Sequence, residues 1–249
     1  MPRLTRACLL LLAAACLPAL PSAAAEQFTP AQRAEIVAIV RQALKQDPSI
    51  LRDAVAALQA DDAAHAAAES QAVLSAHRDM LVTPADPTAG NPRGAVTIVE
   101  FFDTRCPYCR SMEPTMQKLL AEDHEVKLVY KDLPILGSAS VLGSKALLAA
   151  ERQGGYDKLR EAVMQMPSDT TLPMIQAAAE KLGLNWSKLQ HDMQSPAIQQ
   201  QIDANLKLAQ ALDIDGTPAL VIGNQIVPGA LDLADLQKEV AAAQETAKR

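Results

Sequence analysis

The sequence contains few of the residues on which many functional sites depend. Of its 249 residues, four are cysteines, four are histidines and only 3% are aromatic, so aliphatic and alanine side chains must supply most of the core. The histidines, His65, His77, His124 and His191, lack the spacing of metal ligands. Acidic residues outnumber basic ones and give a formal net charge of −6, which argues against nucleic acid as a partner.

Long apolar runs are also scarce. No stretch after residue 25 approaches the roughly 18 apolar residues that span a bilayer. Residues 1–25 start with two arginines, continue with an apolar stretch and end in small residues, which predicts a cleaved secretory signal peptide. Its removal would take away Cys8 and Cys16 and change the net charge to −8. The alternative is a lipoprotein that keeps Cys16 in lipidated form.

The other two cysteines form the motif Cys106-Pro107-Tyr108-Cys109. The β-branched and aromatic residues 96–105 before it predict a buried strand, and the helical pattern after it puts Cys106 at a helix N-terminus. Unpaired N–H groups and the helix dipole favour a thiolate at that position, so we expect Cys106 to attack disulfides readily. We interpret the pair as a redox-active disulfide and expect no other cofactor.

The same motif has other interpretations. Structural zinc needs about four ligands, and the second half of such a site is missing. A purely structural disulfide that closes so short a loop would add little stability. A soft-metal site stays open, because Cys106, Cys109, Met112 and Met116 are spaced so that four sulfur atoms suit Cu(I). The competing interpretation packs both methionines under the helix or along a peptide groove.

The chain before the motif has a different character. Thr29 to Gln32 resembles a capping box, after which apolar residues repeat at helical spacing on both sides of Asp47-Pro48. Alanine then dominates residues 54–76, which predicts a helix with little to bury. We expect residues 26–82 to form a helical segment that packs on copies of itself or on its own catalytic domain. Residues 83–94, rich in proline and glycine, are expected to form a linker.

Residues 95–249 alternate predicted strands with predicted helices, which indicates a mixed α/β domain. A second strand is expected at residues 126–132, followed by a helical insertion at about 138–212. A hairpin with a Gly-Asn turn at residues 217–229 and a final helix at 232–246 complete the predicted domain.

These features together resemble the DsbA family of thioredoxin-fold oxidoreductases. The resemblance is carried by Glu100 six positions before Cys106, by the Cys-x-x-Cys motif and by Gly216-Thr217-Pro218 at the start of a late strand. The N-terminal helical segment is similar to that of the ScsC branch, whose members trimerise through it and act as disulfide isomerases. The resemblance implies a thioredoxin-fold α/β domain with a helical insertion, preceded by an α-helical stalk.

The resemblance also implies a role for each matching residue. Cys106 would be the exposed nucleophile, and Cys109 the buried thiol that resolves the mixed disulfide. Pro218 would be a cis-proline, with Thr217 offering backbone hydrogen bonds to an extended substrate peptide. Glu100 would be a buried carboxylate that moves protons to and from Cys109.

Two neighbouring features bear on the chemistry. Lys131 on the second strand is expected either to pair with Glu100 or to lie in solvent. Pro107 and Tyr108 tune how strongly the thiolate is stabilised, and the strong oxidant of the family has histidine in place of Tyr108. The tyrosine therefore favours an isomerase or reductase over an oxidase.

The expected function is that of a periplasmic disulfide isomerase or reductase that forms a homo-oligomer, with a trimer favoured. Its expected partners are secreted client proteins and a membrane thiol reductase or oxidase that resets the cysteine pair. Two alternatives stay open. One is a DsbA-like dithiol oxidase that introduces disulfides, and the other is a copper-tolerance module that binds copper through Cys106 and Cys109.

Overall fold

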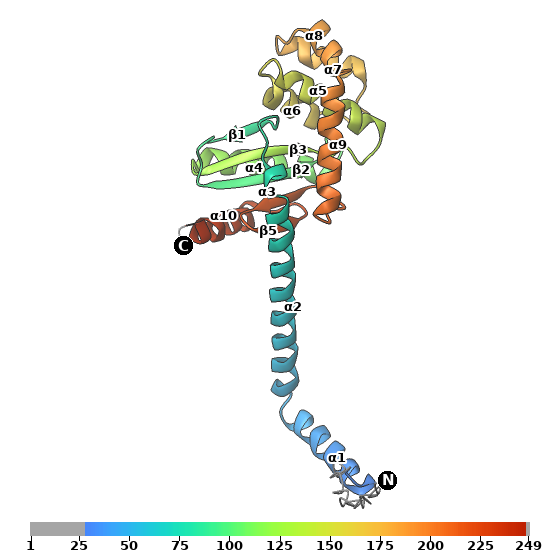
Figure 1. The fold of residues 1–249 in the computed structure, drawn as a ribbon, viewed down its shortest axis with the longest axis vertical. Helices are drawn as coiled ribbons and strands as arrows, with labels where there is room; N and C mark the ends of the chain where they lie inside the picture. Colours follow the sequence, from blue (N-terminus) through green and yellow to red (C-terminus); the bar gives the residue numbers. More distant parts are fainter. Residues whose placement is uncertain (1–27, 248–249) are drawn as a thin grey trace, which may run out of the picture. The chain divides into compact units, whose positions relative to one another are not determined.

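The computed structural model describes residues 28–247. The expected signal peptide, residues 1–25, lies outside the described residues. The chain divides into two compact units with a boundary between Ala60 and Asp61. In chain order the elements are α1 (Pro30–Gln46), α2 (Ser49–Ala76), α3 (Arg78–Leu81), β1 (Thr88–Gly90), β2 (Val96–Phe102), α4 (Pro107–Glu122), β3 (Val126–Asp132), α5 (Ser138–Glu151), α6 (Tyr156–Met164), α7 (Leu172–Lys181), α8 (Trp186–Asp192), α9 (Pro196–Ala211), β4 (Ala219–Ile222), β5 (Gln225–Pro228) and α10 (Leu233–Ala247) (Figure 1).

The first unit consists of α1 and the beginning of α2. The predicted capping box is present: the Thr29 hydroxyl accepts the Gln32 N–H, and the Gln32 side chain accepts the Thr29 N–H. α1 ends at Gln46, and the carboxylate of the next residue, Asp47, accepts the Ser49 N–H at 3.0 Å at the start of α2. No side chain of α1 is buried. Its apolar residues are therefore exposed, namely Ile36, Val37, Ile39, Val40 and Leu44.

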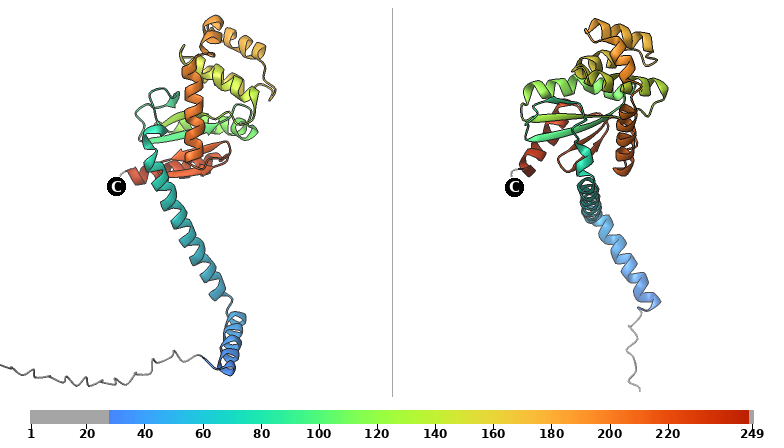
Figure 2. Two further views of the ribbon diagram at one scale, coloured as in Figure 1. Left: turned by 45° about the vertical axis from the view of Figure 1, so that its right-hand side comes forward. Right: turned by 45° about the horizontal axis from the view of Figure 1, so that its top comes forward.

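The second unit is built, within the described residues, on a five-stranded mixed sheet in the order β1-β3-β2-β4-β5. Strands β2 and β3 are parallel, and the other neighbours are antiparallel. The predicted hairpin turns at Gly223-Asn224, between β4 and β5. Helices α5–α8 gather at one end of the sheet, and α9 leads the chain back along it (Figures 1 and 2). The mixed α/β architecture and its helical insertion are thus confirmed.

Alternate residues of the central strand β2 face two different cores. Ile98 and Phe102 join a core that includes Met112 of α4 and residues of α5, α6 and α10. Val99 and Phe101 point the other way, into a second core that includes residues from the ends of α2, α3 and α9. This alternation decides which polar side chains of the sheet can meet.

The prediction that residues 83–94 form a linker is wrong. It contains β1, which pairs antiparallel with β3 and so belongs to the sheet. Gly90 has φ +72°, and a Cβ at this position would lie 2.6 Å from the Val126 carbonyl oxygen, so only glycine fits there. The helical segment ends at Leu81, close to the predicted residue 82. Its last part packs on the catalytic unit, because Leu74 and Leu81 are buried there.

Candidate active site

The turn between β2 and α4 is held by a buried carboxylate. Asp103 is fully buried, and its side chain accepts the backbone N–H groups of Arg105 at 2.8 Å, Ile135 at 2.9 Å and Leu136 at 3.0 Å. Its own carbonyl accepts the Cys106 N–H at 3.0 Å. Asp103 therefore ties the start of α4 to the loop after β3 and fixes where Cys106 lies.

A close approach of α5 supports the same turn. A Cβ on Gly143 of α5 would lie 2.6 Å from the Thr104 hydroxyl oxygen. Thr104 itself is buried, two residues before Cys106. The helix can pack this tightly against the turn only because Gly143 has no side chain.

The two cysteines lie at the start of α4 as predicted. Cys106 is the N-cap residue, Pro107 occupies the first helical position, and Cys109 lies one turn into the helix. Both cysteines are free thiols in this structure. Tyr108, between them, is 66% exposed.

The expectation that Cys106 is exposed is not met. The residue is only 4% exposed, and Cys109 is fully buried. The cause is a contact with the loop before β4, where the Cys106 thiol donates to the Thr217 carbonyl oxygen at 3.0 Å. The order of accessibility still agrees with the sequence, since Cys106 is the less buried of the two thiols.

The Thr217–Pro218 peptide bond that faces Cys106 is cis. The Pro218 carbonyl accepts the Gly229 N–H at 2.9 Å, which joins this loop to the end of β5. Beside it lies a pocket of about 180 Å³, lined mainly by the loop residues 213–219, with Ile226 and Pro228 from β5.

Glu100 is buried and forms an ion pair that the sequence did not predict. Its carboxylate lies 3.1 Å from a guanidinium nitrogen of Arg160 on α6. A second guanidinium nitrogen of Arg160 contacts the carboxylate of Glu113 on α4. Burial raises the pKa of Glu100 from 4.5 to about 7. The positive charge of Arg160 lowers this pKa, and the negative charge of Glu113 raises it.

Burial also raises the pKa of the Cys109 thiol well above its ordinary value. A hydrogen bond from the Asp103 backbone lowers it in part, and the charge of Glu100 raises it further. Because Glu100 acts electrostatically on Cys109, ionisation of one group disfavours ionisation of the other.

Both expectations for Lys131 are wrong. Its side chain is 2% exposed, and its ammonium group lies 2.7 Å from the carboxylate of Asp86. It also donates to the Met80 carbonyl at 2.9 Å. The cause is the parallel register, which places Lys131 beside Phe101 and Tyr130 beside Glu100. Lys131 and Glu100 therefore point to opposite faces of the sheet.

The four residues considered as copper ligands, Cys106, Cys109, Met112 and Met116, are all buried in the same core. Met112 and Met116 are each 2% exposed and belong to the apolar core under α4. Across residues 28–247, no three side chains of His, Cys, Asp or Glu are grouped so that they could hold a metal ion.

No helix within residues 28–247 has the length and apolar character needed to cross a membrane.

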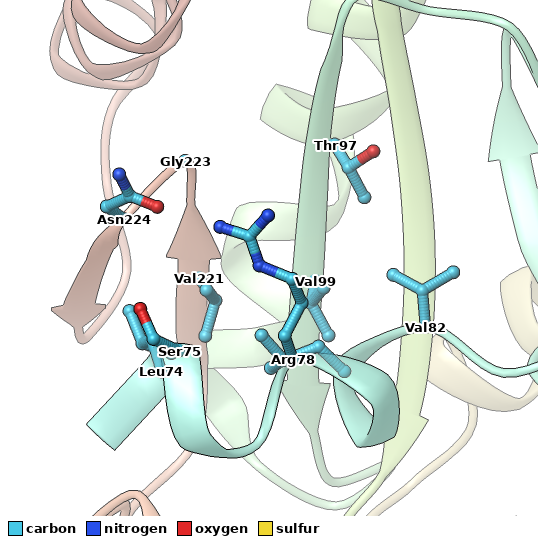
Figure 3. A pocket seen from close by; sticks show the side chains of 10 residues that line it. Leu74, Ser75, Arg78, Val82, Thr97, Val99, Val221, Gly223 and Asn224 are labelled. Carbon is cyan, nitrogen blue, oxygen red and sulfur yellow. The ribbon is translucent and has the colours of Figure 1, made fainter. Parts of the chain in front are cut away.

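A separate pocket of about 310 Å³ lies on the opposite face of the sheet (Figure 3). Figure 3 shows the Arg78 side chain reaching across it from α3, above Val99 of β2 and Val221 of β4. Val99 and Val221 belong to the core that faces away from Glu100 and the cysteines. This pocket is therefore not part of the thiol site.

Comparison with known proteins identifies the family. The family model described as DSBA-like thioredoxin domain matches residues 97–241, more than half of the chain. The chain belongs to the DsbA-like thioredoxin-domain family. A second model, the copper resistance protein ScsC N-terminal domain, matches residues 32–65. The chain is thus a DsbA/ScsC-like member of the thiol–disulfide oxidoreductases, whose redox group is a cysteine pair, and both parts of the resemblance are confirmed.

Solved structures support the same assignment. A thioredoxin-like oxidoreductase from Silicibacter pomeroyi DSS-3 is 40% identical, with a TM-score of 0.65, over 68% of this chain and 98% of that one. ScsC of Proteus mirabilis, in a transitional conformation, is 29% identical with a TM-score of 0.64. That match covers 88% of this chain and 98% of the other. The thioredoxin-like fold of this DsbA-family chain is therefore confirmed.

Curated relatives fall into two kinds. The thiol:disulfide interchange protein DsbA of Burkholderia cepacia is 26% identical over 67% of this chain and 81% of its own length. Na⁺/H⁺ antiporters NhaA of Salinispora tropica and Salinispora arenicola match at 24% identity. The chain spans only 29% and 26% of the length of these antiporters.

Three buried polar groups of the site were missed from the sequence. The first is Arg160, the second is Asp103, which holds the turn before Cys106, and the third is Asp132, which accepts a hydrogen bond from the Tyr156 hydroxyl at 2.7 Å. A signal existed for the first. On α6, Arg160 follows Tyr156 by four positions and precedes Val163 by three, so helical spacing puts it on the buried face.

Proposed function

We propose that this DsbA-family protein is a periplasmic disulfide isomerase in which Cys106 is the nucleophile and Cys109 the resolving thiol. The observation that carries the proposal is the placement of the Cys106 sulfur. It lies at the start of α4, 3.0 Å from the Thr217 carbonyl and next to a cis-proline, with a more deeply buried thiol one helical turn later. The signal-like pattern of residues 1–25 supports export to the periplasm.

The proposed reaction is thiol–disulfide exchange. The Cys106 thiolate attacks one sulfur of a wrong disulfide in the client, which forms a mixed disulfide and releases the other client sulfur as a thiolate. In the isomerisation route, a different client thiolate then attacks the client sulfur of the mixed disulfide. The new client disulfide forms, and Cys106 leaves as the thiolate. The client keeps its number of disulfides, and the enzyme returns to its reduced form.

Cys109 provides the second way out of the mixed disulfide. Its thiolate attacks the Cys106 sulfur, forms the Cys106–Cys109 disulfide and releases the client sulfur, which takes a proton from solvent. The client is then reduced by two electrons, and the enzyme is oxidised. Because burial raises the pKa of Cys109, this step needs a base, and we assign that role to Glu100. A membrane thiol reductase would return the oxidised pair to its reduced form.

Client binding is assigned to the surface around the thiols. The backbone of Thr217, beside cis-Pro218, would hydrogen-bond an extended client segment in place of its present contact with Cys106. Tyr108, Ile135 and Leu136 are exposed, and the N–H groups of Ile135 and Leu136 bind Asp103, three residues before Cys106. Exposed apolar side chains near the thiols suit the apolar surface of an unfolded client.

The oligomeric state is part of the proposal. The apolar side chains of α1 are exposed, and this helix has no buried residue in a single chain. A helix that carries an apolar stripe normally buries it, so we propose that copies of this segment cover each other. The match of the ScsC N-terminal domain model to residues 32–65 supports this arrangement, and a trimer is favoured.

The test combines activity with oligomeric state on the same sample. The full protein without residues 1–25 should restore activity to scrambled ribonuclease and should measure as an oligomer by light scattering. A variant that starts at Asp61 should be a monomer with much less isomerase activity. The truncation ends there because Leu74 and Leu81 belong to the catalytic core. Cys106→Ser should have no activity in either form, and a monomeric full-length protein would refute the stalk.

A dithiol oxidase is the second candidate, favoured by the curated relatives named DsbA and probable disulfide bond formation protein D. The exposed Tyr108 argues for the isomerase, since it offers the thiolate no cationic neighbour. The redox state of Cys106 and Cys109 in periplasmic extracts separates the two, because an isomerase is kept reduced and an oxidase is kept oxidised. Copper binding by the two cysteines stays a prediction.

A further inference from the structure

Arg160 is a buried cation that takes no direct part in the exchange of sulfur atoms. It lies on α6, within the helical insertion, and is 1% exposed. Its guanidinium contacts two carboxylates from different elements, Glu100 of β2 at 3.1 Å and Glu113 of α4. Arg160 is thus shared between Glu100, the proposed acceptor of the Cys109 proton, and Glu113, which lies on the helix after Cys106.

The orientation of this guanidinium is fixed by aromatic rings. Its central carbon lies 4.6 Å from the ring centre of Phe102 and 4.3 Å from that of Tyr130. Two ring faces and two carboxylates leave the side chain little freedom, which suits the planar fork of arginine better than the single ammonium of lysine. A buried cation held in this way stabilises negative charge on the partner that it contacts.

We propose that Arg160 is a positioning residue for thiol–disulfide exchange: by dividing its charge between Glu100 and Glu113, it keeps Glu100 available as the carboxylate that accepts the Cys109 proton. The inference rests on the proposed function, because it concerns the step in which Cys109 releases the client. In that step the Cys109 S–H bond breaks, its proton passes to Glu100, and the new thiolate attacks the Cys106 sulfur.

The two partners of Arg160 have opposite effects on Glu100. The Arg160 charge lowers the pKa of Glu100, and the Glu113 charge raises it. Removal of Arg160 should therefore leave Glu100 protonated up to a higher pH, and neutralisation of Glu113 should let it ionise at a lower pH. The other titratable groups around this cluster are Cys106, the N-cap residue of α4, Cys109 of α4, Tyr130 and Asp132 of β3, and Tyr156 and Asp157 of α6.

The experiment follows the two sulfur steps separately. The reduced full-length protein is mixed with an aromatic disulfide, dithiobis(nitrobenzoate), in a stopped-flow spectrometer across a range of pH. Cys106 attacks first, forms a mixed disulfide and releases one coloured aromatic thiolate. Cys109 then forms the intramolecular disulfide and releases the second aromatic thiolate. The first phase reports Cys106, and the second reports the step in which Glu100 and Arg160 act.

The variants shift the second phase in opposite directions. In Arg160→Met its pH midpoint should rise by about one to three pH units, and in Glu113→Gln it should fall. Arg160→Lys, which keeps the charge, should bring the midpoint back toward that of the parent protein. Arg152→Met, which removes a partly exposed arginine of the insertion that pairs with Asp192, should shift nothing. The first phase should be the same in all of these proteins.

A purely structural role for Arg160 would not produce shifts of opposite sign. If the second-phase profiles of Glu113→Gln and the parent coincide, or if both variants shift the same way, the inference is overturned. Glu113→Gln keeps the test decisive even where Arg160→Met fails to fold. Absence of the first phase in the parent protein would instead refute the proposed function itself, so the two failures are distinguishable.

Discussion

Replacement of Glu100 by glutamine should make the stability of the catalytic unit less dependent on pH. Burial raises the pKa of Glu100 from 4.5 to about 7, with Arg160 opposing and Glu113 adding to the effect. The folded protein therefore binds this proton more tightly than the unfolded chain does. Stability is highest where both states are protonated and falls as the pH rises through the interval between the two pKa values.

The magnitude follows from the size of the interval. Most of the interval between the two pKa values lies between about pH 5 and about pH 8. Over this range the unfolding free energy should fall by about 2 to 3 kcal/mol because of Glu100. Glutamine has the same shape and cannot ionise, so Glu100→Gln should lose this part of the pH dependence. Some dependence should remain, because burial also raises the pKa of Asp132 from 3.8 to about 7.

The assay is urea unfolding of the reduced protein at these two pH values. Trp186 is the sole tryptophan of the chain and begins α8 of the insertion, so its fluorescence follows the unit that contains Glu100. The urea dependence itself should not change, since the same surface is exposed on unfolding. A Glu180→Gln variant, at an exposed position, serves as the matched control and should behave like the parent. A parent-like difference between the two pH values in Glu100→Gln would refute the reasoning.

Two further changes test the packing on either side of the sheet. Lys131→Met should lower the unfolding free energy by about 3 to 5 kcal/mol, because it leaves the buried carboxylate of Asp86 without its cationic partner. The double variant Lys131→Met/Asp86→Leu should recover much of that loss in the same urea titration. Gly143→Ala should cost about 1 to 3 kcal/mol, since its Cβ would crowd Thr104 before Cys106. It should also change the rate at which Cys106 is alkylated, and a normal rate with normal stability would contradict the close packing of α5.

Local signals explain what could be predicted from the sequence. The capping box at Thr29, the cysteine spacing and the Gly-Asn turn each depend on residues close together in the chain. A motif of this kind forms the same local structure in many surroundings, because its hydrogen bonds and backbone preferences are internal to it. The positions of α1, the start of α4 and the β4–β5 hairpin therefore follow from the amino-acid sequence alone.

The ion pairs could not be predicted, because they depend on register and on distant elements. Lys131 and Glu100 lie on neighbouring parallel strands, and a shift of one residue in register decides whether they share a face. The actual partners are Asp86, 45 residues before Lys131 in the chain, and Arg160, 60 residues after Glu100. The short strand β1 was missed because proline and glycine around it are typical of linkers.

The ammonium group of Lys131 fastens the incoming chain to the sheet. It holds both the Met80 carbonyl and the Asp86 carboxylate, on the face opposite to the thiols. A replacement of the chain before Asp61 therefore leaves this anchor in place, together with the buried Leu74 and Leu81. The two faces of β3 thus have different roles, since Lys131 holds the incoming chain on one face and Tyr130 packs against Arg160 on the other.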